Sequence, residues 1–167
     1  MAVEQGLVLI KPDGVVKQIS GDVMNRLADT GLHLVGAKMV QVSQELAHAH
    51  YHHLKDKAFF KELIDYIMGK LHQRPVFALV YEGESACERL RKAIGATNPE
   101  EAEPTSIRGK YGRITSKGVF ENVVHASENP KEAEREIKLW FAPQDLIHAM
   151  YPTEEKSVEQ KVKVWRN

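Results

Sequence analysis

Apolar and polar positions along the chain follow two different periods, which predicts strands that alternate with helices. Compact apolar runs typical of buried strands occur in four places: 6–11, 32–42, 75–83 and a short run ending at His125. Apolar residues recur every three or four positions, as on one face of a helix, in five segments: 20–30, 44–53, 59–68, 85–95 and 130–141. Such stripes indicate helices that each bury one side against a sheet.

The order of these segments is strand, helix, strand, inserted helices, strand, helix, strand and helix. This order predicts an α+β fold, the ferredoxin-like split βαβ sandwich, with a four-stranded antiparallel sheet covered by helices. Residues 97–118 show little periodicity and many turn formers, so we expect a long loop there, of the kind that usually carries function. We expect residues 1–167 to form one domain with a polar C-terminal tail at about 152–167.

The amino-acid composition limits which classes of binding partner are expected. Lys and Arg together number 23, as do Asp and Glu, so no overall charge favours nucleic acid or an anionic membrane. The single Cys87 fits a reducing compartment. The chain has no apolar stretch of the roughly 20 residues that a membrane span needs, and its first residues do not resemble a signal peptide. A cytoplasmic location is therefore expected.

His125 stands between the last predicted strand and the helix that follows it. Asn129 is a suitable N-cap and Pro130 suits the first helical position. The residues of this helix expected to face the sheet are Ala133, Ile137 and Trp140. Glu136 lies beside them, where a carboxylate needs a partner, and the nearest candidate is the ring of His125. A glutamate that fixes one ring nitrogen would leave the other as a nucleophile, although a surface glutamate with a capping histidine is the plain alternative.

Binding a phosphate needs cations, and the sequence contains neither a Walker A motif nor a G-x-G-x-x-G motif. The basic candidates are Lys11 at a strand end, Arg91 on a helix and Arg108 in the long loop. Thr97 and Asn122 could add neutral hydrogen bonds. Guanidinium groups suit phosphate oxygens, but each of these residues taken alone is typical of a solvated surface position.

Several stretches together resemble one family. They are "LVLIKPDGV", "HYHHLKDKAFFKEL", "RKAIGATNP", "SIRGKYG" and "ENVVHAS…EAEREIKLWF". Their order and spacing are similar to those of nucleoside diphosphate kinases, from about Leu7 to about Leu146. The set as a whole is far more specific than any single fragment.

The resemblance implies a role for each candidate. His125 would take the terminal phosphate of a nucleoside triphosphate and pass it to a nucleoside diphosphate, in a ping-pong reaction. Glu136 would orient the ring of His125, and Ser127 would support that glutamate. Lys11, in the KPDG match, would contact the phosphate and the sugar 3′-hydroxyl, with Tyr51 beside the histidine.

The same resemblance implies the nucleotide contacts and the partners. Phe59 would stack on the base without reading its edge, so every base would be accepted. The residues that would hold the phosphates and the sugar are Arg91, Thr97, Arg108 and Asn122. Mg²⁺ would arrive with the nucleotide and no protein metal site is expected. The family assembles as homo-oligomers, either hexamers or tetramers.

The sequence also departs from the family pattern. Insertions are expected near 69–73 and 110–121, the glycine after Pro104 is missing, and Lys110 replaces an aspartate. This region normally shapes the base pocket and the subunit contacts. The resemblance therefore does not identify the second stacking residue or the type of oligomer.

Three other interpretations of the sequence are a zinc site, an RNA-binding module and an inactive regulator. On one continuous helix, His48 and His52 would lie one turn apart, as would His50 and His53, which is a possible zinc spacing without a third ligand. Ferredoxin-like sheets also bind RNA through aromatic residues, but the strands here lack such a pair. An inactive relative serving as a regulator would more often have lost one of the chemical residues.

Overall fold

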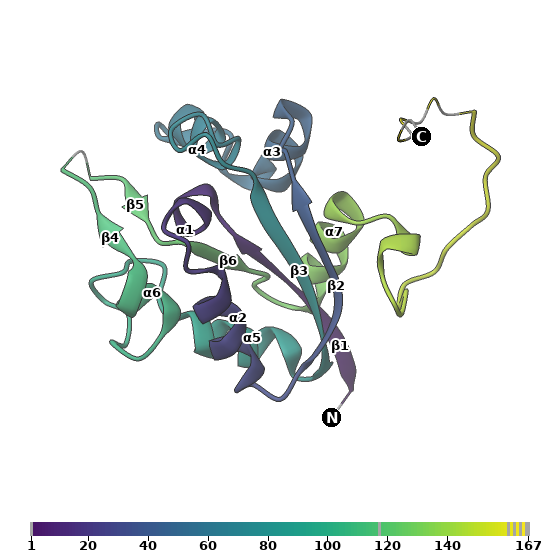
Figure 1. Cartoon of the computed structure of the whole chain (residues 1–167), viewed down its shortest axis with the longest axis horizontal. Helices are drawn as coiled ribbons and strands as arrows, with labels where there is room; N and C mark the ends of the chain where they lie inside the picture. Colours follow the sequence, from purple (N-terminus) through teal and green to yellow (C-terminus); the bar gives the residue numbers. More distant parts are fainter. Residues whose placement is uncertain (1, 117, 160, 162, 164, 166–167) are drawn as a thin grey trace.

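A four-stranded antiparallel sheet forms the centre of the molecule (Figure 1). The computed structural model describes residues 2–116, 118–159, 161, 163 and 165. The strands of this sheet are β1 (Val3–Ile10), β2 (His33–Val40), β3 (Val76–Glu84) and β6 (Val124–Ala126). Their spatial order is β2-β3-β1-β6. This order is that of the split βαβ sandwich and confirms the predicted fold class.

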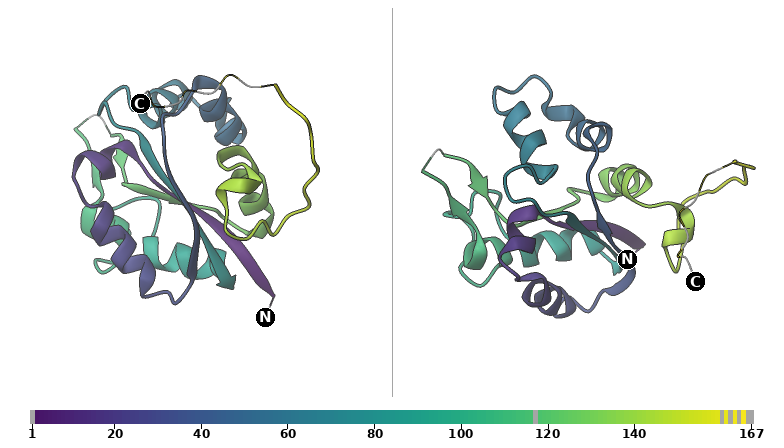
Figure 2. Two further views of the ribbon diagram at one scale, coloured as in Figure 1. Left: turned by 45° about the vertical axis from the view of Figure 1, so that its right-hand side comes forward. Right: turned by 45° about the horizontal axis from the view of Figure 1, so that its top comes forward.

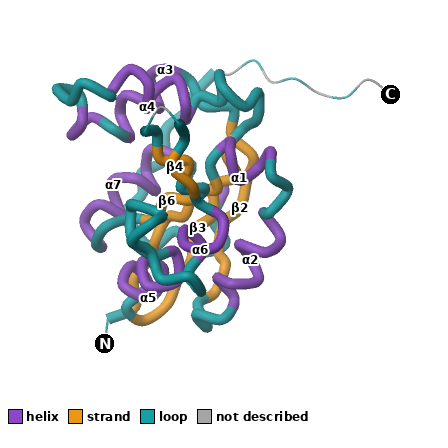
Figure 3. Tube along the Cα trace, turned by 90° about the vertical axis from the view of Figure 1, so that its left-hand side faces the viewer, coloured by secondary structure: helices purple, strands orange, loops and turns teal. Residues whose placement is uncertain are grey.

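Helices cover both faces of the sheet (Figure 2). One face carries α2 (Ser20–Ala28) and α5 (Ala86–Ile94). The other carries α3 (Gln44–His50), α4 (Phe60–Ile67) and α7 (Pro130–Trp140). Shorter pieces are the helices α1 (Pro12–Val16) and α6 (Ile107–Tyr111) and the 3₁₀ turns His52–Leu54 and Pro143–Asp145. Figure 3 shows α3 and α4 beyond the end of the sheet, with α6 on the near side.

The burial of β1 explains why its sequence is continuously apolar. Leu7 and Leu9 pack into the core beneath α3, α4 and α7, whereas Val8 and Ile10 pack against α2 and α5. Successive side chains of a strand point to opposite faces, so a strand covered on both sides needs apolar residues at every position. β1 is therefore a fixed central strand, and its Leu9 lies opposite His125 of β6.

Helix α7 begins where the sequence predicts. The side chain of Asn129 accepts a hydrogen bond from the backbone N–H of Glu132 at 3.0 Å, and Pro130 is the first helical residue. The cap satisfies one of the free N–H groups of the first turn. By fixing where the helix starts, the cap also determines that the side chain of Glu136 is buried.

The prediction of an unbroken loop over 97–118 is wrong. Helix α6 interrupts it, with the side chain of Ser106 accepting from Gly109 N–H at 3.1 Å. Strand β4 (Arg113–Ile114) then pairs with β5 (Phe120–Glu121) in a two-stranded hairpin. Five-residue helices and two-residue strands are too short to produce a readable period, which is why the pattern missed them.

The two segments expected to be insertions lie against each other. Glu121 of the hairpin is buried, and its carboxylate accepts from Arg113 Nε at 2.6 Å. Nε2 of His72 lies 3.4 Å from the other carboxylate oxygen of Glu121. The segment 69–73 thus supports the hairpin, one residue before Asn122.

The chain after α7 crosses the edge of β2. Ile147 N–H donates to the carbonyl of Val35 at 2.8 Å, and Lys38 pairs with Asp145 at 2.6 Å. Residues 152–159 beyond it are exposed. Within the described residues, no helix combines the length and the apolar character needed to span a membrane.

Candidate active site

His125, Glu136 and Ser127 form one hydrogen-bonded chain. Oε1 of Glu136 lies 3.0 Å from Nε2 of His125, and Ser127 Oγ donates to Oε2 at 2.6 Å. Ser127 is fully buried and its Oγ accepts from the N–H of Leu7 on β1, at 3.1 Å. Three elements, β1, β6 and α7, therefore fix the glutamate, and the glutamate fixes the ring.

Glu136 is ionised although it is buried. Burial raises the pKa of Glu136, but the hydrogen bond and charge of His125, the charge of His50 and the hydrogen bond from Ser127 together lower it to about 2. An ionised carboxylate only accepts hydrogen bonds, so the neutral His125 ring carries its proton on Nε2. The lone pair of Nδ1 is then available for chemistry.

The expected strand ending at His125 instead begins at Val124 and ends at Ala126, so His125 lies in its middle and a strained turn precedes it. Val123 has φ 56°, a left-handed backbone that is rare for a β-branched residue. A buried carboxylate, that of Asp13, accepts from Val123 N–H at 3.1 Å, and the Val123 carbonyl accepts from Lys11 N–H at 2.8 Å. A Cβ on Gly14 would lie 3.0 Å from the same carbonyl oxygen. The KPDG stretch thus stabilises this turn.

A second network lies beside the first. Lys11 Nζ donates to Asn122 Oδ1 at 2.6 Å, and Asn122 Nδ2 donates to the carbonyl of Thr97 at 2.8 Å. Arg108 Nη1 donates to the Gly95 carbonyl at 3.1 Å and lies 3.5 Å from Thr97 Oγ1. Arg108 also donates to the carbonyl of Val124, the residue before His125, at 3.1 Å. This contact joins the two networks.

The electrostatics of the second network suit an anion. Lys11 and Arg108 are both buried, and neither forms an ion pair within the described part of the chain. Burial, then the charge of Arg108, lowers the pKa of Lys11 to about 8, although Asp13 acts in the opposite direction. Burial, then the charge of Arg91, lowers the pKa of Arg108 to about 10, although Tyr51 acts in the opposite direction. Two buried cations held by neutral acceptors provide the charge and the hydrogen-bond donors that a group with several negative oxygens requires.

Tyr51, Phe59 and Arg91 lie outside these hydrogen-bond networks. Tyr51 is buried, and burial followed by the charge of Glu136 raises the pKa of its phenol. Phe59 precedes α4 with 52% of its surface exposed. The side chain of Arg91 is exposed on α5, and its charge contributes to the lowered pKa of Arg108. Seven of the ten predicted residues thus take part in the two hydrogen-bond networks, whereas the buried Tyr51 and the exposed Phe59 and Arg91 do not.

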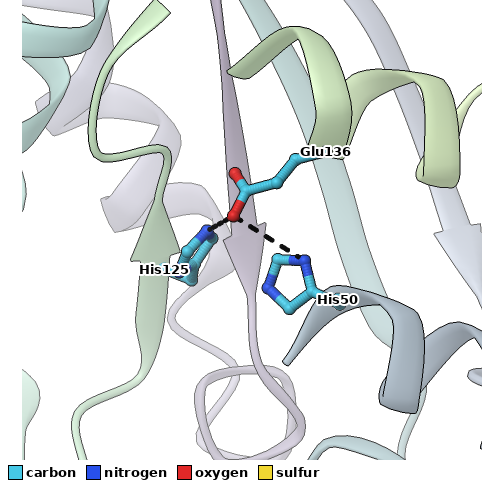
Figure 4. A group of neighbouring side chains, drawn as sticks. All are labelled: His50, His125 and Glu136. Carbon is cyan, nitrogen blue, oxygen red and sulfur yellow. Dashed lines mark hydrogen bonds and ion pairs between the residues drawn. The ribbon is translucent and has the colours of Figure 1, made fainter. Parts of the chain in front are cut away.

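His50 is a buried member of the site that the sequence did not identify. Its ring lies edge to face with that of His125, with the centroids 4.7 Å apart (Figure 4). His50 Nδ1 lies 3.8 Å from Oε1 of Glu136. Among the described residues, these three form the one group of histidine, cysteine and acidic side chains whose geometry could hold a metal. Several of its possible ligand atoms are already engaged by hydrogen bonds, because Trp140 donates to His50 Nδ1 and both carboxylate oxygens of Glu136 have partners.

The zinc interpretation of the HAHYHH stretch assumed one continuous helix, and that assumption is wrong. Helix α3 ends at His50, and residues 52–54 form a 3₁₀ turn. His48, His52 and His53 are exposed, whereas His50 is buried against α7. The overlooked signal was the spacing of Ala47, His50 and Tyr51, which lie on one helical face as core residues do.

Glu136→Gln tests the electrostatic role of the carboxylate. The pKa of Glu136 lies below its ordinary value of 4.5, so the ionised form stabilises the fold above about pH 4.5. That stabilisation is lost as the pH falls towards 2. Between about pH 5 and about pH 3, we expect the difference in unfolding free energy between wild type and variant to shrink by about 2 kcal/mol. Urea denaturation at one protein concentration measures it.

The matched control is Glu134→Gln, the same change on the same helix at a partly exposed residue. For this variant the difference from wild type should change by only a few tenths of a kcal/mol, on the order of an exposed ion pair, over the same pH range. A decrease of equal size in both variants would contradict the role given to Glu136.

Comparisons with known proteins show the family of the chain. The chain matches the family model described as "Nucleoside diphosphate kinase" over residues 4–146. The nucleoside diphosphate kinase of Symbiobacterium thermophilum is 49% identical over 138 residues, covering 83% of this chain and 87% of that protein. That of Pyrococcus horikoshii is 45% identical over 149 residues, covering 89% and 90%.

Solved structures give the same result. A nucleoside diphosphate kinase of Halobacterium salinarum in complex with CDP aligns with a TM-score of 0.79 at 39% identity, over 88% of this chain and 93% of that one. The Borrelia burgdorferi nucleoside diphosphate kinase, a transition state mimic with bound vanadate and ADP, aligns with a TM-score of 0.79 at 35% identity, over 91% and 94%. Sequence and fold therefore agree: the chain belongs to the nucleoside diphosphate kinase family.

Proposed function

We propose that this protein transfers the terminal phosphate of a nucleoside triphosphate to a nucleoside diphosphate through a phosphorylated His125. One observation carries the proposal: Glu136 is hydrogen-bonded to Nε2 of His125, which leaves Nδ1 free, and the buried cation of Arg108 binds the carbonyl of the preceding Val124. Family membership supports the reaction class.

The proposed reaction has two half-reactions at the same nitrogen. Nδ1 of His125 attacks the γ-phosphorus, an N–P bond forms, the bond to the β,γ-bridging oxygen breaks, and a nucleoside diphosphate leaves. The ring becomes positive as it is phosphorylated, and the ionised Glu136 at 3.0 Å stabilises that charge. A second nucleoside diphosphate then attacks the phosphorus and restores the neutral histidine, which gives ping-pong kinetics.

Positioning and charge account for the proposed catalysis. A phosphoryl group passes through a loose transition state with negative charge on its oxygens. In this proposal Lys11, Arg108 and Arg91 neutralise that charge. Thr97 also contacts the phosphates, and Asn122 contacts the sugar. Tyr51 would stand next to the histidine. The partly lost charge of buried Lys11 would be restored when a phosphate enters the site.

Mg²⁺ is proposed to enter with the nucleotide. The donor set supports this, because the Glu136 carboxylate is already hydrogen-bonded on both oxygens and the second network contributes the cations Lys11 and Arg108. Bound across the phosphates, the ion would supply further neutralisation of their charge.

Phe59 is proposed to stack on the base. Its ring is half exposed at the start of α4, and stacking uses the π-face that every base presents. Broad base specificity follows from that contact. The second stacking residue is not assigned.

The assembly is proposed to be a homo-oligomer, a hexamer or a tetramer. The edge strand β2 exposes Met39 and Leu34, which supports a subunit contact. A cytoplasmic location, and the lack of a nucleic-acid or membrane partner, stay predictions from the sequence.

His125→Ala tests the proposed function. After incubation with γ-labelled ATP and Mg²⁺, the wild type should retain label that is lost in acid, survives alkali and moves to added GDP. The variant should retain none, because it lacks the nucleophile. An unlabelled wild type, or a variant labelled to the same extent, would contradict the proposal.

Phe59→Ala tests base stacking. Loss of the ring should raise KM about tenfold, and by a similar factor for GDP and CDP, since stacking is worth about 1–3 kcal/mol for any base. Leu139→Ala, which removes another exposed apolar side chain, is the control and should leave both values unchanged. A strong effect on one nucleotide alone would show that Phe59 selects the base.

A further inference from the structure

His50 is unusual among the eight histidines of the chain because it is almost completely buried. Helix α7 holds it from several sides. Arg135 donates to the carbonyls of Ala49 and His50 at 3.0 and 3.3 Å, and Trp140 Nε1–H donates to His50 Nδ1 at 3.2 Å. These contacts fix both the backbone and the ring of His50 relative to Glu136.

The hydrogen bond from Trp140 determines the protonation of the ring. An indole nitrogen only donates, so His50 Nδ1 must present its lone pair and the proton of the neutral ring lies on Nε2. A charged His50 would place two N–H groups against each other. Burial, and then the neighbouring His125, lower the pKa of His50 well below its ordinary value, although Glu136 acts in the opposite direction.

The second nitrogen of His50 faces the nucleophile. Nε2 is buried and has no hydrogen-bond partner within the described residues. In Figure 4 it lies on the side of the ring that points at His125. The two rings meet at 81°, so an N–H edge approaches an aromatic face, which is the favourable arrangement for these partial charges. The contact with the ring face accounts for the buried Nε2–H of His50, which has no conventional acceptor within the described residues.

His125 needs a second restraint. The hydrogen bond to Glu136 fixes the position of Nε2 but leaves the ring plane free to swing, because the second side-chain torsion of histidine has a broad energy well. We propose that His50 is a positioning residue, whose buried ring, locked by Trp140, holds the plane of the His125 imidazole and so places Nδ1 for attack. The proposal rests on the proposed function of His125.

The test compares His50→Leu with wild type in two measurements. A misplaced nucleophile slows chemistry without weakening nucleotide binding, so the single-turnover rate of His125 phosphorylation should fall about 10- to 100-fold. The dissociation constant for ADP should stay within about twofold, because neither His50 nor Trp140 is among the proposed nucleotide contacts. His53→Leu, the same change at an exposed residue nearby, should alter neither value.

A double variant separates the ring contact from general packing. His50→Phe with Trp140→Phe keeps an aromatic edge against His125 and removes the indole N–H that would otherwise lose its acceptor. It should recover the rate to within about fivefold of wild type, whereas His50→Leu should not.

A rate unchanged in His50→Leu, or a loss that appears equally in ADP binding, would overturn the proposal. Histidine NMR of the wild type provides an independent check that needs no variant to fold. It should show His50 neutral with its proton on Nε2 at about pH 6, and the opposite tautomer or a charged ring would also overturn the proposal. Label on wild-type His125 would leave the proposed function intact in either case.

Discussion

The buried carboxylate of Glu136 is the constraint on which the site depends. It accepts from His125 and from Ser127, and both contacts require that α7, β6 and β1 be placed correctly at once. Removing one of these donors leaves a buried carboxylate oxygen unsatisfied, which typically costs about 1–3 kcal/mol and more for a charged group. The same carboxylate leaves Nδ1 as the free nitrogen of His125, the one proposed to react. One interaction thus contributes to the fold and to the proposed chemistry.

The second constraint is the strained turn at Val123. Asp13 and the backbone of Lys11 hold it, and Lys11 then reaches Asn122 with its side chain. The residues that stabilise the turn are thus adjacent to those proposed to hold the phosphates. A site in which backbone strain, buried cations and an oriented histidine meet is preorganised, and little rearrangement is needed when an anion arrives.

Periodicity was enough to predict the sheet and its covering helices, because β1 and β3 are buried over most of their length and each long helix buries one face. The pairing of His125 with Glu136 was also predictable, since an inward-facing carboxylate needs a partner close to it. Asp13 and His50 were not identified, because their roles depend on contacts between segments far apart in the sequence. The hairpin of β4 and β5 was missed for another reason: two-residue strands have no period.

The most direct test of this account is the position of the phosphate on the histidine ring. The hydrogen bond from Nε2 of His125 to Glu136 leaves only Nδ1 free to attack. The phosphorylated protein, hydrolysed in alkali and analysed by chromatography or by ³¹P NMR against both phosphohistidine isomers, should therefore yield the Nδ1 isomer. The Nε2 isomer, or phosphate on another residue, would contradict the role of Glu136 as the group that orients the nucleophile.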